Sequence, residues 1–154
     1  MLKNRIQISC LVFTMLVSSA VKAEEPTRIV TRFEHSAKTM LAVVSEGNLE
    51  PRSIGSYCLR VYYLGNPDFP YDHFVTGLIM PRDGSLEKVL IADLNGDEVP
   101  EIIVTIRSAG TGSYLSADAF QFDGKHLIHY KSFSNLPKDT DPIQILKADT
   151  VSKI

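Results

Sequence analysis

The fold of this chain is decided by a short apolar run, Glu101-Ile102-Ile103-Val104-Thr105-Ile106, followed by Arg107-Ser108-Ala109-Gly110-Thr111-Gly112-Ser113-Tyr114. β-Branched residues favour strands, so residues 101–106 predict a strand. Two glycines separated by one residue allow backbone conformations that other residues rarely adopt, so residues 107–114 predict a protruding loop. A rigid strand would then carry a hydroxyl-lined tip, which is a common place for binding residues. A long turn without a binding role is the alternative that composition leaves open.

Short strands are predicted on both sides of this run. The expected strands are residues 39–44, 57–64, 73–80, 86–92, 99–106, 114–122 and 125–133. In the second of these, Leu59, Val61 and Tyr63 share one face, the alternation that is typical of a half-buried strand. We find no convincing amphipathic helix. About seven or eight short strands at regular spacing predict an all-β protein, an antiparallel β-sandwich or barrel.

Turn signals separate the expected strands. Pro81-Arg82-Asp83-Gly84 predicts a four-residue turn, and therefore a hairpin between its flanking strands. Asp123-Gly124 predicts a two-residue hairpin turn. Residues 46–53 and 64–72 are rich in Gly, Pro, Asn and Asp and are expected to be connections. The tail at 136–154 is expected to begin as a loop and then to fray or add an edge strand.

The first 23 residues predict export. Two basic residues precede an apolar run from Ile6 to Val17, and Val21-Lys22-Ala23 offers small residues at the positions that a signal peptidase reads. The apolar run is too short to span a bilayer and no second one follows, so a membrane anchor is disfavoured. We expect a signal peptide at 1–23, one mature domain at 24–154, and no membrane association after cleavage.

The expected mature chain is acidic. The first 23 residues hold three basic residues and no acidic one, so 13 basic and 18 acidic residues remain, a formal charge of −5. This charge disfavours nucleic acid as a partner and favours cationic partners, with an attraction that salt weakens. Cys58 is the only cysteine expected after cleavage, so it has no internal disulfide partner. We expect a buried thiol, with intermolecular pairing as the alternative.

The stretch Asp93–Glu101 has oxygen-bearing side chains at alternate positions, as a calcium loop does. Calcium prefers about six to eight oxygen atoms, and a site here would use Asp93, Asn95, Asp97 and Glu101. Helix-loop-helix calcium sites need flanking helices, whereas strands are expected around this stretch. Carboxylates also stabilise tight turns without a metal. We therefore expect no metal or other cofactor, and we keep calcium binding as the alternative.

Residues typical of catalysis are not grouped in the sequence. Residues 112–116 lack the second glycine of the hydrolase nucleophile motif and precede a strand rather than a helix. The four histidines fall in different segments, without metal-ligand spacing: His35, His73, His126 and His129. A binding protein is therefore favoured over an enzyme.

Several segments, in consistent order over about residues 40–122, resemble the periplasmic inhibitors of invertebrate-type lysozyme. These segments are Gly55-Ser56-Tyr57, Pro81–Gly84, Asp93–Asp97, Arg107–Gly110 and Gly112–Phe120. The resemblance implies a β-sandwich, in agreement with the strand pattern. It also implies an exported, periplasmic bacterial protein that blocks a lysozyme and is not itself an enzyme. A homodimer is compatible with it.

The resemblance assigns inhibition to a loop with the order serine, glycine, any residue, tyrosine, which enters the enzyme's active-site cleft. Threonine replaces the serine here, and hydroxyl groups would take the place of sugar hydroxyls at the two carboxyl groups of the cleft. The expected lysozyme-binding residues are Thr111, Tyr114, Gly112, Ser113, Gly110, Ser108 and Arg107. Ser56 or Tyr57 would support the loop if the two segments lie side by side; otherwise Tyr57 is an ordinary strand residue. A calcium-dependent or carbohydrate-binding module is the alternative function.

Overall fold

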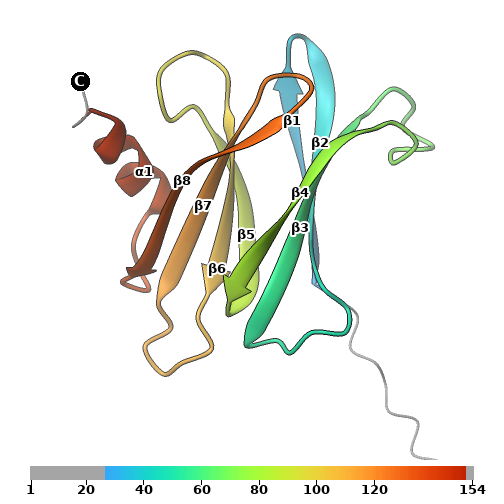
Figure 1. The fold of residues 1–154 in the computed structure, drawn as a ribbon. Helices are drawn as coiled ribbons and strands as arrows, with labels where there is room; N and C mark the ends of the chain where they lie inside the picture. Colours follow the sequence, from blue (N-terminus) through green and yellow to red (C-terminus); the bar gives the residue numbers. More distant parts are fainter. Residues whose placement is uncertain (1–26, 152–154) are drawn as a thin grey trace, which may run out of the picture.

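Two antiparallel sheets of four strands pack face to face in the computed structural model, which describes residues 27–151 (Figure 1). The first sheet has the order β1 (Arg28–His35), β2 (Lys38–Glu46), β3 (Ile54–Tyr63) and β4 (Phe74–Asp83). The second has the order β5 (Ser85–Ala92), β6 (Glu101–Arg107), β7 (Leu115–Phe122) and β8 (Leu127–Leu136). The predicted β-sandwich is confirmed, and the two sheets do not close into a barrel. The expected signal peptide lies outside the described residues.

The C-terminal tail begins as the expected loop, but the expectation that it then frays or adds an edge strand is wrong, because residues 142–151 form a helix, α1 (Pro142–Val151). Its start carries a standard capping arrangement: the Asp141 carboxylate accepts the backbone N–H of Ile143 at 2.9 Å, and Pro142 occupies the first helical position. No helix in the described part of the chain is long and apolar enough to cross a membrane.

Strand β1 was not among the sequence expectations. Its side chains alternate, with Phe33 buried and Arg28 and Arg32 exposed, so only one face is apolar. Every residue of β1 pairs with a residue of β2, and β1 is the first strand in the sheet order, so it lies at the edge of the first sheet. The sequence of β1 therefore does alternate between its two faces, but the many charged residues of the exposed face make this segment look like a loop.

The continuous apolar run at 101–106 is explained by burial on both faces of β6. One face carries Ile102, Val104 and Ile106 into the core between the sheets. The other face carries Ile103 into a second core, where it packs with Leu146 of α1. All six residues are buried, so the strand needs apolar side chains on both faces rather than alternation.

The hairpin expected at Pro81–Gly84 is wrong, because β4 and β5 belong to different sheets. Gly84 alone separates them, with φ of +121°, and its backbone N–H donates to the Ser53 carbonyl at 2.9 Å. A Cβ atom on Gly84 would lie 2.1 Å from the Arg107 carbonyl oxygen. Only glycine therefore allows the chain to cross between the sheets at this point.

Two smaller expectations also need correction. The hairpin at Asp123-Gly124 exists, but its loop has four residues, closed by the Asp123 carboxylate, which accepts the N–H groups of Lys125 and His126. Those backbone bonds lower the pKa of Asp123 to about 2. Cys58 is free but partly exposed rather than buried, because its neighbours Tyr57 and Leu59 point into the core and leave it on the outer face.

The packing of α1 on the second sheet predicts a clear difference between two adjacent helix positions. Leu146→Ala removes a fully buried side chain and should lower the free energy of unfolding by about 2–5 kcal/mol. Lys147→Ala, at an exposed position of the same helix, should change it by less than about 0.5 kcal/mol. Urea unfolding of both variants measures these values. Equal stabilities would show that the helix does not pack on the sheet.

Candidate functional site

The loop between β6 and β7 lies at one end of the sandwich, the lower end in Figure 1. Residues 109–112 are exposed, and the Tyr114 side chain is 49% exposed. Tyr114 precedes the first residue of β7, so it is a loop residue and does not pack on the sheet as a strand residue would. Two backbone bonds close the loop, from Ser108 N–H to the Tyr114 carbonyl at 2.9 Å and from Ser113 N–H to the Gly110 carbonyl at 3.1 Å.

Arg107 holds the base of this loop. Its guanidinium group forms a bidentate pair with Glu87, with nitrogen to oxygen distances of 2.5 and 2.9 Å. Its Nη1 also donates to the carbonyls of Ser113, at 2.8 Å, and Lys138, at 3.1 Å. The hydrogen bond between the two side chains raises the pKa of Arg107 and lowers that of Glu87. Arg107 was expected to bind the lysozyme; in the structure its guanidinium group is occupied by contacts within the protein, and it braces the loop.

The two glycines of the loop do not act through unusual backbone angles, which corrects the sequence expectation. Neither has a positive φ, and the left-handed residue is Ser113, with φ of 45°. A Cβ atom on Gly112 would lie 2.3 Å from the Tyr114 ring, so Gly112 provides the space in which the ring lies. Gly110 borders open space. The strained backbone of Ser113 is held by the Arg107 and Gly110 contacts described above.

Ser108 lies at the base of the loop rather than at its tip. Its side-chain oxygen is buried and has no hydrogen-bond partner among the described residues. Of the predicted binding residues, the structure thus brings four to the exposed tip, with Ser113 partly exposed between them: Gly110, Thr111, Gly112 and Tyr114. It places Ser108 and Arg107 beneath them.

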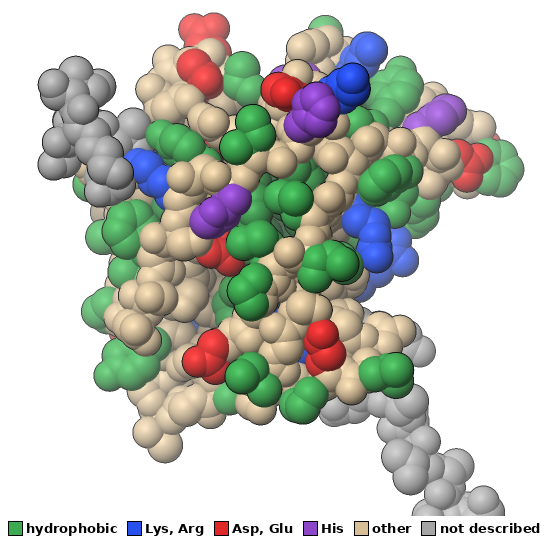
Figure 2. Space-filling view, in the orientation of Figure 1, with side chains coloured by type: hydrophobic (Ala, Val, Ile, Leu, Met, Phe, Trp, Pro, Cys, Tyr) green, Lys and Arg blue, Asp and Glu red, His purple; other side chains and the backbone are tan. Residues whose placement is uncertain are grey.

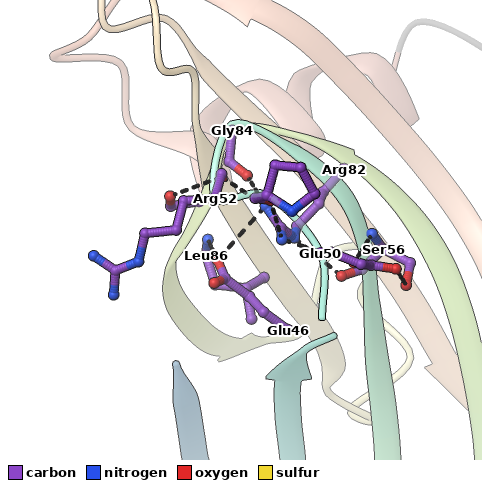
Figure 3. Close-up of polar contacts among 9 residues, drawn as sticks. Glu46, Glu50, Arg52, Ser56, Arg82, Gly84 and Leu86 are labelled. Carbon is purple, nitrogen blue, oxygen red and sulfur yellow. Dashed lines mark hydrogen bonds and ion pairs between the residues drawn. The ribbon is translucent and has the colours of Figure 1, made fainter. Parts of the chain in front are cut away.

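A buried guanidinium, that of Arg82, joins the segments behind this end of the sandwich (Figure 3). Arg82 is 4% exposed, and its Nε donates to the Ser56 carbonyl at 3.0 Å. It also donates to the carbonyls of Pro51, Arg52 and Gly84. The carboxylates of Glu46 and Glu50 lie 4.0 and 3.7 Å from it. All the donors of Arg82 therefore serve the fold, and the motif that sequence reasoning interpreted as a turn is the centre of this cluster.

Neither Ser56 nor Tyr57 supports the loop. Ser56 donates through its backbone N–H and its hydroxyl to Glu50, at 2.5 and 2.7 Å. Tyr57 is fully buried and donates its phenol to Asp118 of the opposite sheet at 2.7 Å. Burial raises the pKa of Tyr57. Tyr57 is thus a core strand residue that links the two sheets. This agrees with the alternative expectation, that Tyr57 is an ordinary strand residue.

Asp118 also accepts the hydroxyl of Ser132, which contacts His129 Nε2 at 2.7 Å. This group contains the residue types of a hydrolase triad, but in the wrong order. Asp118 lies 4.0 Å from the same His129 nitrogen and does not orient the other side of the ring. The cluster therefore does not have the geometry that activates a serine nucleophile.

The loop at 93–101 is a set of turns closed by its own side chains. The Asp93 carboxylate accepts N–H groups from Asn95, Gly96 and Glu98, at 3.2, 2.7 and 3.1 Å, and these bonds, led by that from Gly96, lower its pKa. Glu101 is 2% exposed and accepts the Leu94 N–H at 2.7 Å. Across residues 27–151, no three His, Cys, Asp or Glu side chains are grouped as metal ligands. The calcium alternative is therefore without geometric support.

Taken together, these observations define a class of fold: a two-sheet antiparallel β-sandwich with an exposed loop that is braced at its base by Arg107. A family model described as periplasmic lysozyme inhibitor of I-type lysozyme matches residues 31–150. The chain belongs to this family, whose members are inhibitors rather than enzymes.

Two solved structures are similar to the chain. One is the crystal structure of PliI-Ah, the periplasmic lysozyme inhibitor of I-type lysozyme from Aeromonas hydrophyla. It is 43% identical, with a TM-score of 0.68, over 77% of this chain and 99% of that one. The other is Aeromonas hydrophila PliI in complex with Meretrix lusoria lysozyme, 44% identical, with a TM-score of 0.68, over 77% of this chain and 95% of that one. Among curated proteins, none matches.

The Arg107–Glu87 pair predicts a pH-dependent loss of stability. Because Arg107 lowers the pKa of Glu87, the carboxylate form stabilises the fold, and this contribution is present above pH 4.5 and lost at lower pH. Glu87→Gln should lower the free energy of unfolding by up to about 1 kcal/mol near neutral pH. The difference from the unsubstituted protein should shrink at about pH 3. Urea unfolding at both pH values measures it, and a difference that grows in acid would contradict the assignment.

The turn geometry of Asp93 predicts indifference to calcium. A ligand that binds the folded state raises the melting temperature by mass action. Since the oxygens of Asp93 already accept three backbone N–H groups, millimolar calcium should shift the melting temperature by less than about 1 °C. Thermal scans with calcium and with EDTA test this. A rise with calcium that EDTA reverses would restore the calcium-loop interpretation.

Proposed function

We propose that this protein inhibits invertebrate-type lysozymes by inserting the loop at 108–114 into the active-site cleft. Membership of the inhibitor family supports the activity, and the similar structure in complex with Meretrix lusoria lysozyme supports the partner class. The observation that carries the site is the half-exposed Tyr114 ring, seated over Gly112 at the tip of a loop that Arg107 braces.

Thr111 and Tyr114 supply the chemistry of the proposed contact. Within residues 27–151 neither side-chain hydroxyl has a hydrogen-bond partner, so both are free to donate to an enzyme. A glycosidase cleft holds two carboxyl groups around the scissile bond of its sugar substrate. A hydrogen bond to a charged acceptor is worth about 1.5–3 kcal/mol. Two such bonds would replace those that the sugar makes.

An ordered loop increases the affinity that these contacts provide. A loop that is ordered before binding loses less conformational entropy when the complex forms. The two backbone bonds of the loop and the Arg107 contact with the Ser113 carbonyl fix its backbone, while Gly112 lets the Tyr114 ring fold down against it. Tyrosine also brings apolar area with few rotatable bonds, which is typical of binding hot spots.

The working form in this proposal is the periplasmic mature domain, residues 24–154, after removal of a signal peptide at 1–23. Its formal charge of −5 would steer it toward a cationic enzyme at low salt. The proposal is compatible with a homodimer and does not require one. Mass spectrometry of the exported protein checks the cleavage site, and sedimentation of the mature domain gives its oligomeric state.

The direct test is cell-wall lysis by invertebrate-, chicken- and goose-type lysozymes, with and without the mature protein. The proposal expects the strongest slowing for the invertebrate-type enzyme. Unchanged rates for all three enzymes would reject it.

Substitutions at the loop tip test the site within that activity. Thr111→Val replaces the hydroxyl by a methyl group of similar size, and Tyr114→Ala removes the ring. Each should raise the inhibition constant about tenfold or more, since one charged hydrogen bond is worth that much. Tyr71→Ala is the matched control, because Tyr71 is 43% exposed and lies in the β3–β4 connection. Thermal melts check that each variant folds. Full potency in both tip variants would move the inhibitory site elsewhere.

A further inference from the structure

The inhibitory loop is small compared with a stable protein interface. Specific interfaces use roughly 20–30 residues on each side. The loop spans residues 108–114 and lies at one end of the sandwich, so neighbouring segments of the same end must contribute to a tight complex. The candidates are the connections that emerge beside it.

We propose that Leu49, in the β2–β3 connection at residues 47–53, is a second contact with the lysozyme, on an apolar surface beside the cleft. The inference rests on the proposed function and deepens it by naming an additional determinant of affinity. Leu49 is 100% exposed, so its side chain contributes nothing to the stability of its own fold. Figure 2 shows hydrophobic side chains exposed along the lower end of the molecule, the end at which these loops lie.

Direct contacts place the β2–β3 connection next to the inhibitory loop. Gly84 donates its N–H to the Ser53 carbonyl at 2.9 Å, and the Cβ position of Gly84 lies 2.8 Å from the Ser108 Cα. Ser85 donates its hydroxyl to the Arg52 carbonyl at 3.2 Å, and it pairs with Arg107 across the sheet. Gly84 and Ser85 thus bridge the end of the β2–β3 connection and the base of the inhibitory loop.

The connection that carries Leu49 is held in one conformation. Glu50 accepts the backbone N–H and the hydroxyl of Ser56, and its carboxylate faces Arg82 at 3.7 Å. These hydrogen bonds with Ser56 lower the pKa of Glu50. Cβ atoms on Gly47 and Gly55 would lie 2.6 and 2.3 Å from the Glu50 carboxyl group, so both glycines leave room for it. Arg82 binds the carbonyls of Pro51 and Arg52, which follow Glu50 in the chain (Figure 3). On the other side of Leu49, the Gly47 N–H donates to the Ser56 carbonyl at 3.4 Å.

This arrangement distinguishes Leu49 from other exposed apolar residues. Single exposed apolar side chains are normal on a protein surface. Leu49 differs because the hydrogen bonds of Gly47 before it and Glu50 after it, both with Ser56, hold the backbone that carries it beside the inhibitory loop. An apolar side chain on a backbone that is already ordered adds little backbone entropy cost on binding and gains by leaving water, which suits a contact with an apolar patch on the enzyme.

Leu49→Ser tests the inference, with Ile79→Ser as the matched control. Ile79 is 71% exposed and lies on β4. Inhibition constants against invertebrate-type lysozyme are measured for the unsubstituted protein, both serine variants and Tyr114→Ala. Leu49→Ser should raise the constant about tenfold, as loss of a moderate interface hot spot does, and Ile79→Ser should leave it unchanged. Melting temperatures of both serine variants should match that of the unsubstituted protein, because both side chains are exposed.

The outcomes separate this inference from the proposed function. If Tyr114→Ala is impaired and Leu49→Ser inhibits fully, the second contact is wrong and the cleft-binding loop stands. If Ile79→Ser is impaired as much as Leu49→Ser, the effect is not local and the inference is overturned. If the unsubstituted protein does not inhibit the enzyme, the proposed function fails first, and the second contact fails with it.

Discussion

The arrangement of the end of the sandwich that carries the 108–114 loop depends on the buried guanidinium of Arg82. The chain passes from one sheet to the other through Gly84 alone, and there the carbonyls of Pro51, Arg52, Ser56 and Gly84 point toward one small volume. A cation with five N–H donors satisfies these carbonyls at once, and two carboxylates compensate its charge. Glu46 also accepts the Leu86 N–H of the other sheet at 2.7 Å. Without that cation, the four carbonyls would lose a donor and the two carboxylates would lose their counter-charge, which costs more than the loss of one surface ion pair.

Much of the fold was predictable because strand periodicity is a local property. Residues 57–64 and 114–122 alternate apolar and polar side chains, and each corresponds to an observed strand, β3 and β7. The sequence alone did not predict which strands pair. Pro81–Gly84 has the composition of a hairpin turn, yet Gly84 is a crossing between sheets, and only the contact with the Arg107 carbonyl makes glycine necessary there. The helix at Pro142–Val151 was missed although Asp141-Pro142 is a recognisable start signal, because its apolar face is short.

The exposure of the loop tip was predicted from the sequence, but the contacts that hold the loop were not. Family resemblance and small residues both indicated residues 107–114, and the structure places Thr111 and Tyr114 at an exposed tip. The bracing partner Glu87 comes from another strand, 20 residues away, and no local pattern connects it with Arg107. The glycines were expected to supply unusual backbone angles, whereas Gly112 supplies space for a ring and Ser113 takes the left-handed conformation. Tertiary contacts decide such roles, and a single sequence does not contain them.

The central claim is that the loop at 108–114 occupies the substrate cleft of the enzyme. A crystal structure of the mature protein bound to an invertebrate-type lysozyme tests it most directly. The account predicts the Thr111 hydroxyl and the Tyr114 phenol within hydrogen-bond distance, about 2.5–3.0 Å, of the carboxyl groups that flank the scissile bond. A complex in which this loop points into solvent while the cleft stays open would contradict it.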